Sequence, residues 1–171
     1  GEVVPLRSAL TFFSDLPSQV EDFSPGKSAV IHQVGQAKIA PIICFELIDD
    51  RLLQSSADVS NLFVVQTNSA TFANTAQSAQ QLAITRIRSI EHARYSVSVS
   101  TIGISAIVDT NGIVLKSTKE NIATSINEAV ALNATQTVYD RLGEFAWVLV
   151  LLIGLGFGAG LGYAARVVKR R

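Results

Sequence analysis

The amino-acid sequence predicts a layered α/β domain with a mixed β-sheet, followed by one membrane-spanning helix. Three observations carry this prediction. Strand-like apolar segments alternate with helix-like segments in the order β-β-α-β-α-β-β-β, which is typical of layered α/β domains. The tetrapeptide Asp-Thr-Asn-Gly at 109–112 joins two apolar segments in the way that hairpin turns do. Near the C-terminus, the 21 residues Phe145–Ala165 contain no charged side chain.

The strands are predicted where β-branched or alternating apolar residues stand between turn-forming residues. Asn61–Gln66 reads Asn-Leu-Phe-Val-Val-Gln and has the composition of a buried strand. Ala123–Leu132 is a candidate for one more strand before the linker to the membrane helix. The other predicted strands are Ser28–Val34, Lys38–Cys44, Tyr95–Thr101, Ile104–Val108 and Ile113–Lys116.

Two helices are predicted between these strands. Phe45–Ser55 forms a short helix, whereas Gln77–Arg94 has the clearest helical periodicity of the chain. In the longer helix one apolar stripe forms, and the charged residues lie largely on other faces. This stripe consists of Ala79, Ala83, Ile87 and Ile90.

The uncharged run at 145–165 has the length of a membrane span. At ~1.5 Å per residue, 21 helical residues cover about 31 Å, close to the hydrocarbon thickness of a bilayer. Trp147 and Tyr163 stand near its two ends, where aromatic residues anchor membrane helices at the interface. A buried core helix is the alternative interpretation.

Basic residues follow the predicted span and indicate its orientation. Because positive charge favours the cytoplasmic side, we expect a cytoplasmic C-terminus and an extracytoplasmic domain in the plasma membrane. The predicted organisation is an extracytoplasmic domain at 1–140, a membrane helix at 141–165 and a basic tail at 166–171. The tail's basic residues are Arg166, Lys169, Arg170 and Arg171.

The composition excludes several kinds of partner. The formal net charge is +0 and no basic patch interleaves with aromatic residues, so nucleic acid is not an expected partner. With one cysteine and two histidines, the chain has no internal disulfide and no Cys/His metal spacing. We therefore predict neither a cofactor nor a metal. The absence of methionine indicates a fragment or a processed product.

Cys44 is the residue that points most directly to chemistry. It ends the apolar run Ala40–Ile43 immediately before a predicted helix, so its sulfur can lie at the sheet edge beside backbone N–H groups. The alternative is a small core residue, which is the commoner role of a lone cysteine. Glu46, two residues later, either orients groups around the thiol or caps the helix. Asn68 follows the next strand and either positions a carbonyl group or forms a turn.

A nucleophilic thiol needs a base, and the sequence offers weak candidates. His92 stands beside Glu91 in the long helix, and we expect it at the surface. His32 lies within a predicted strand and has no evident partner. Glu2 is a candidate acid or base with almost no visible context.

Five segments, in order, resemble the apolipoprotein N-acyltransferase family of the nitrilase (carbon–nitrogen hydrolase) superfamily. Gly1–Pro5 resembles the family's GEYVP segment, and Pro41–Glu46 resembles its P-x-I-C-Y-E nucleophile motif. Gln66–Phe72 is similar to the loop that follows, in the form seen in actinobacterial members. Gln80–Arg94 resembles the Q-x-x-M-x-R-x-R-A-x-E-x-G-R helix, and Thr101–Ala106 resembles N-x-G-x-S-A.

The resemblance implies a nitrilase-like α-β-β-α sandwich, here its C-terminal part, carried on transmembrane helices of a multi-pass protein. It implies lipoprotein maturation by a ping-pong mechanism. A cysteine takes an acyl chain from a phospholipid as a thioester, and the α-amine of a diacylglyceryl-cysteine apolipoprotein then accepts that chain.

Position by position, the resemblance assigns roles to several residues of this chain. Cys44 matches the nucleophile, and Glu46 and Glu2 match supporting active-site carboxylates. Phe45 replaces a tyrosine of the motif, and with Asn68 it is a candidate for substrate binding. The lysine and glutamate that complete the family's Glu-Lys-Cys triad precede Gly1 and are absent from this chain. Ala93 stands where the family's helix has glycine.

Two other functions remain open at this level. A membrane-anchored amidase of the nitrilase type would use water in place of the lipoprotein amine. A catalytically inactive, single-span binding domain would need no base at all.

Overall fold

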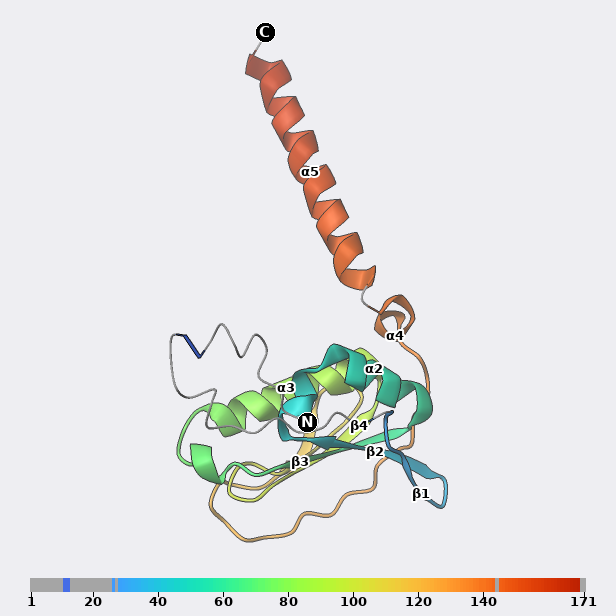
Figure 1. The fold of residues 1–171 in the computed structure, drawn as a ribbon, viewed down its shortest axis with the longest axis vertical. Coiled ribbons are helices and arrows are strands. Elements are labelled where there is room, and N and C mark those ends of the chain that lie inside the picture. The colour runs from blue at the N-terminus through green and yellow to red at the C-terminus, as the bar shows by residue number, and fades with distance from the viewer. Residues whose placement is uncertain (1–10, 13–25, 27, 144, 170–171) are drawn as a thin grey trace.

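The computed structural model describes residues 11–12, 26, 28–143 and 145–169. Its centre is a six-stranded sheet in the order β1-β2-β3-β4-β5-β6 (Figure 1). The middle strands β2, β3 and β4 run parallel, whereas β1, β5 and β6 pair antiparallel with their neighbours. The strands are β1 (His32–Val34), β2 (Ala37–Ile43), β3 (Leu62–Thr67), β4 (Tyr95–Ser100), β5 (Ala106–Val108) and β6 (Val114–Ser117).

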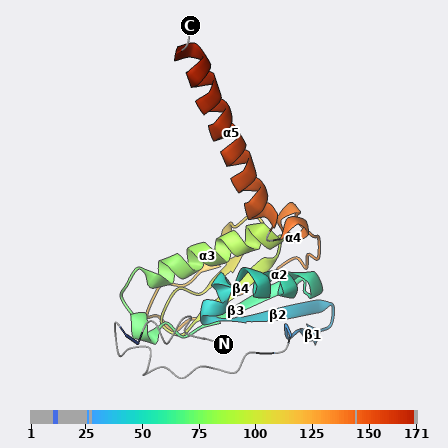
Figure 2. The same ribbon diagram turned by 45° about the horizontal axis from the view of Figure 1, so that its top comes forward.

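Helices connect the parallel strands and cover one face of the sheet (Figure 2). Because a parallel connection needs a crossover, β2 leads through two helical segments to β3, and β3 leads through α3 to β4. The helical segments are η2 (Cys44–Ile48), α2 (Asp50–Val59), η3 (Ala70–Phe72), α3 (Gln77–His92), α4 (Val138–Leu142) and α5 (Phe145–Lys169).

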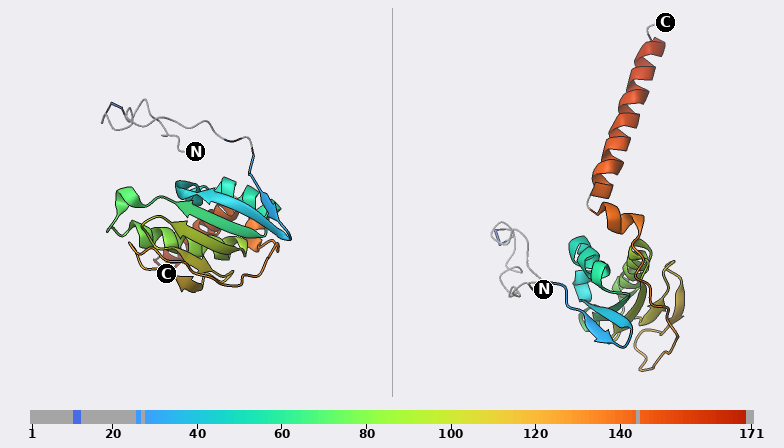
Figure 3. Two further views of the ribbon diagram at one scale, coloured as in Figure 1. Left: turned by 90° about the horizontal axis from the view of Figure 1, so that it is seen from below. Right: turned by 90° about the vertical axis from the view of Figure 1, so that its right-hand side faces the viewer.

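The hydrophobic core lies between the sheet and the helices. It consists of Ala40, Ile42, Leu47, Leu53, Ala57, Phe63 and Val65. The alternate residues of the same strands point to the opposite face, and at the ends of β2 and β4 they include the exposed Ile43 and Val99. Seen from below, this face of the sheet lies in front of the helices (Figure 3). The α/β class and the mixed sheet are therefore as predicted.

The α3 helix buries a different face from its apolar stripe. Ile87 and Ile90 are 52% and 49% exposed. The residues toward the sheet are instead mostly small or polar: Ser78, Thr85, Arg88, Ser89 and His92. Opposite them, β4 presents serines, and the Ser89 hydroxyl donates to the Ser96 hydroxyl over 2.7 Å. Pairing the two hydroxyl groups lets the helix approach β4 here with both serine side chains hydrogen-bonded.

Most predicted boundaries differ from the structure by one or two residues, and three predictions differ more. The first strand is shorter than 28–34, and the helix predicted at 45–55 is two helical segments. They separate at Asp49, whose side chain caps α2 by accepting from the backbone N–H groups of Arg51 and Leu52. The strand predicted at 123–132 is wrong, because this segment crosses the molecule without pairing with any strand.

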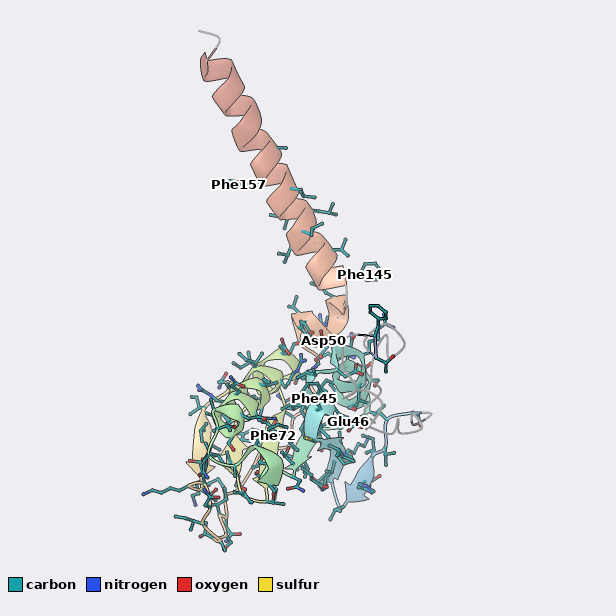
Figure 4. The ribbon with its side chains drawn as sticks, turned by 60° about the vertical axis from the view of Figure 1, so that its left-hand side comes forward. Phe45, Glu46, Asp50, Phe72, Phe145 and Phe157 are labelled. Carbon is teal, nitrogen blue, oxygen red and sulfur yellow. The ribbon has the colours of Figure 1, made fainter. Side chains whose placement is uncertain are left out.

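The chain leaves the domain through α4 and α5, and α5 extends away from the sheet (Figures 1 and 3). Its described side chains are exposed, among them Phe145 and Phe157, which Figure 4 labels. Within the described part of the chain, no helix combines the length and the hydropathy that crossing a bilayer requires. The membrane span is therefore still a prediction.

Candidate functional site

Cys44 lies at the sharp turn between β2 and η2. Its φ angle is 50°, in the left-handed region that residues with a side chain rarely adopt. The thiol is free, and the residue is partly buried. A backbone conformation of this kind costs of order 1–3 kcal/mol and persists only where surrounding contacts hold it.

Glu46 supplies one such contact. Its carboxylate accepts the backbone N–H of Ile43 over 2.8 Å, and its carbonyl accepts the backbone N–H of Asp49 over 3.0 Å. Glu46 therefore fastens both the residue before Cys44 and the residue after the turn. Of the two roles that the sequence left open, this geometry favours the cap. Figure 4 shows Glu46 and Phe45 on the η2 turn.

Asn68 is held in a defined orientation at the end of β3. The backbone N–H of Ala70 donates to its Oδ1 over 3.1 Å, which identifies that atom as the oxygen. The Thr101 hydroxyl donates to the same oxygen over 2.9 Å. The Asn68 side-chain NH₂ group has no hydrogen-bond partner among the described residues. It is thus a positioned donor that is free for another molecule.

The sheet brings these groups to one edge. Cys44, Asn68 and Thr101 each follow one of three neighbouring parallel strands, which lie ~4.8 Å apart, and the carboxyl ends of parallel strands meet at the same edge. A cavity of about 370 Å³ opens there, lined by Gln66, Thr67, Asn68, Val99, Ser100 and Thr101. This is the edge at which open α/β sheets bind ligands.

Comparison with known proteins shows the family to which the chain belongs. The family model described as carbon-nitrogen hydrolase matches residues 7–139, which is most of the chain. The chain belongs to the carbon–nitrogen hydrolase family.

The chain is similar to several named proteins. A protein of Geobacter metallireducens named apolipoprotein N-acyltransferase is 31% identical over 100% of this chain and 32% of its own length. One of the same name from Mycolicibacterium smegmatis is 31% identical over 100% of this chain and 30% of its own. The chain thus spans about a third of the length of these relatives. An amidase from Nesterenkonia sp. shares 16% identity over 58% of this chain and 40% of its own, with a TM-score of 0.49.

The two candidate histidines lie in different environments in the structure. His92 is fully buried, so the expectation of a surface residue is wrong. Its Nδ1 lies 2.5 Å from the Asp140 carboxylate, and its ring packs against Phe63 and Tyr139. Since it ends α3 just before β4 begins, it lies at the opposite sheet edge from Cys44. His32 is exposed on β1.

Phe45 and Glu2 are the remaining candidate site residues. Phe45 is 58% exposed, so its ring is available to an apolar ligand. Glu2 lies outside the described residues. Among the described residues, no three His, Cys, Asp or Glu side chains gather where they could hold a metal ion.

Two features near the carboxyl edge of the sheet were not predicted from the sequence. One is Thr101, whose bond to Asn68 joins loops 33 residues apart. The other is a serine cluster around Gly103, where a side chain would approach the Ser78 and Ser100 hydroxyl oxygens to 2.5 and 2.7 Å. Glycine therefore lets this loop pack against the edge. The glycine of the N-x-G-x-S-A resemblance was the available signal for that packing.

Proposed function

We propose that this chain is the C-terminal part of an apolipoprotein N-acyltransferase of the plasma membrane. The observation that carries the proposal is the left-handed Cys44 at the carboxyl edge of the sheet, where the oriented Asn68 amide follows the neighbouring strand. The relatives' names supply the reaction class.

In the proposed reaction, the Cys44 thiolate attacks the ester carbonyl of a phospholipid. A C–S bond forms, the ester C–O bond breaks, and a lysophospholipid leaves with a proton on its hydroxyl group. The α-amine of a diacylglyceryl-cysteine lipoprotein then attacks the thioester. An amide forms, the proton released from the amine passes to the base that protonated the lysophospholipid, and Cys44 leaves as thiolate, ready for another cycle.

Residues of this chain would support both steps. The free N–H groups of Asn68 would donate to the carbonyl oxygen as it gains negative charge. Glu46 would keep the turn closed, and Phe45 would contact the acyl chain. Glu2 would be a supporting carboxylate. The proposed base, a lysine, and its partner glutamate belong to the protein upstream of Gly1.

The proposed setting is the membrane that holds the substrates. With α5 as a membrane span, the basic tail that follows it would be cytoplasmic and the sheet would face outward. Tethering the site at the bilayer would raise the local concentration of both lipid substrates.

Replacing the nucleophile tests the proposal. In the complete natural protein, in membranes, Cys44→Ser should lower lipopeptide acylation at least about 1,000-fold. Incubation with labelled phospholipid should leave a hydroxylamine-labile label on the wild type and none on the variant. Because Cys44 is the only cysteine of this chain, a thioester on a peptide from it reports this residue alone.

Two other results would overturn the proposal. Near-normal turnover by Cys44→Ser would exclude Cys44 as the nucleophile. Cys44-dependent release of free acid from amides, without transfer to the lipopeptide amine, would identify an amidase.

A further inference from the structure

The η2 turn that begins with Cys44 is held at its far end by an arginine of another helix. Arg88 of α3 is 8% exposed, and its Nε–H donates to the carbonyl oxygen of Leu47 over 2.8 Å. Leu47 is itself a core residue and the fourth of five residues in η2. The bond therefore fixes the turn three residues after the strained Cys44.

The Arg88 guanidinium is held in place on two further sides. Its Nη2 lies 2.6 Å from the Asp50 carboxylate at the start of α2, and its Nη1 lies 2.7 Å from the Glu91 carboxylate. Burial disfavours the charged form, but the bonds to Glu91 and Asp50 outweigh it and raise the pKa of Arg88. One permanently charged, planar group thus joins η2, α2 and α3. Figure 4 shows Asp50 close to the η2 turn.

We propose that Arg88 is a positioning residue for the Cys44 nucleophile, acting through the Leu47 carbonyl. This inference rests on the proposed function. A left-handed cysteine relaxes unless its turn is fixed at both ends. Glu46 fixes the end at Ile43, and Arg88 fixes the end at Leu47. Without Arg88, the thiol would spend less time in the attacking geometry.

The same helix provides a matched control. Arg86 lies two residues earlier, and its Nε–H donates to the carbonyl oxygen of Gly112 over 2.7 Å, in the turn between β5 and β6. Both arginines therefore make one Nε–H bond to a backbone carbonyl, but only Arg88 reaches the nucleophile turn. Lysine at either position keeps the charge and loses the Nε–H donor.

The experiment compares Arg88→Lys with Arg86→Lys in the complete protein. For Arg88→Lys we expect kcat for lipopeptide acylation to fall 10- to 100-fold, with KM within about twofold. We expect the alkylation of Cys44 by iodoacetamide to slow at least threefold. Arg86→Lys should match the wild type within about twofold in all three measurements. A merely structural role would change stability without this division between kcat and KM.

A second variant keeps the test decisive if Arg88→Lys does not fold. Glu91→Gln leaves the Leu47 bond intact and removes one carboxylate, so kcat should fall less than tenfold. Unchanged kcat and alkylation in Arg88→Lys, or equal losses in Arg86→Lys, would overturn the inference. If either result occurs while Cys44→Ser is inactive, the proposed function still holds. An active Cys44→Ser variant would overturn the proposed function itself.

Discussion

Two buried arginines, one within α3 and one just after it, satisfy their guanidinium groups in different ways. Arg88 meets the carboxylates of Asp50 and Glu91 directly, and its pKa is raised. Arg94, which follows α3, is 1% exposed, and its pKa is lowered by burial, with Asp140 and Asp58 offsetting only part of the effect. Among the described residues, the hydrogen-bond partners of the Arg94 guanidinium are the backbone carbonyls of Ala57, Ser60, His92 and Thr135.

This difference shows two structural roles that a buried cation can have. Carbonyl oxygens satisfy N–H groups but do not neutralise a charge, so Arg94 keeps part of its desolvation cost. In return it joins the ends of α2 and α3 to the segment before α4. The charge of Arg88 is paired with two carboxylates, and its Nε–H group holds the η2 turn. The amino edge of the sheet is thus a structural junction, whereas the carboxyl edge carries the proposed nucleophile.

The largest expected effect comes from removing the Arg94 junction. Arg94→Met leaves the carbonyls of three buried residues and of the exposed Thr135 without their donor, and we expect it to lower the free energy of unfolding by about 3–5 kcal/mol. Denaturant unfolding of the complete protein in detergent measures this loss. Arg141→Met is the control, because Arg141 is exposed on α4 and should change stability by less than about 0.5 kcal/mol. Equal losses in both variants would contradict the comparison.

The sequence could predict the six strands of the sheet and the position of Cys44, because both depend on local pattern. The buried strands β2 and β3 are short apolar runs, and a cysteine after such a run falls at the sheet edge wherever the strand is parallel. The hairpin between β5 and β6 follows from the turn sequence at its centre.

The buried polar contacts could not be predicted, because their partners are far apart in sequence. His92 has the neighbours of a surface residue, and its burial depends on Asp140, 48 residues later. The orientation of Asn68 depends on Thr101 in the same way. Hydrophobic periodicity also misassigned α3, since the face toward β4 is lined by small hydroxyl side chains such as Ser89. Apolar pattern carries no information about such pairs.

An intermediate effect is expected at the carboxyl edge of the sheet. Thr101→Val keeps the shape of the side chain and removes the donor to Asn68 Oδ1, so the amide loses one of its two fixed bonds. We expect kcat for acylation to fall up to about tenfold, equivalent to about 1.4 kcal/mol, with stability changed by about 1 kcal/mol or less. Thr101→Ser retains the hydroxyl and should restore most of the activity. Wild-type kcat in the valine variant would exclude this positioning of Asn68.

The smallest effect has the opposite sign and lies next to Arg94. Ala93 ends α3 with φ 48° and ψ 42°, the left-handed conformation in which glycine is favoured. The resemblance to the N-acyltransferase helix places glycine at this position. Relief of the left-handed strain exceeds the extra entropy of glycine in the unfolded chain, so Ala93→Gly should raise the free energy of unfolding by about 0.5 kcal/mol.

The same substitution within α3 makes that sign testable. Ala83 lies on the exposed side of the helix interior, where glycine costs about 1 kcal/mol through the entropy of the unfolded chain alone. Ala83→Gly should therefore destabilise the domain while Ala93→Gly stabilises it, in one denaturant series on the complete protein. Destabilisation by both variants would mean that the left-handed cap is not strained by its methyl group. The junction around Arg94 would then hold the backbone of Ala93 without cost.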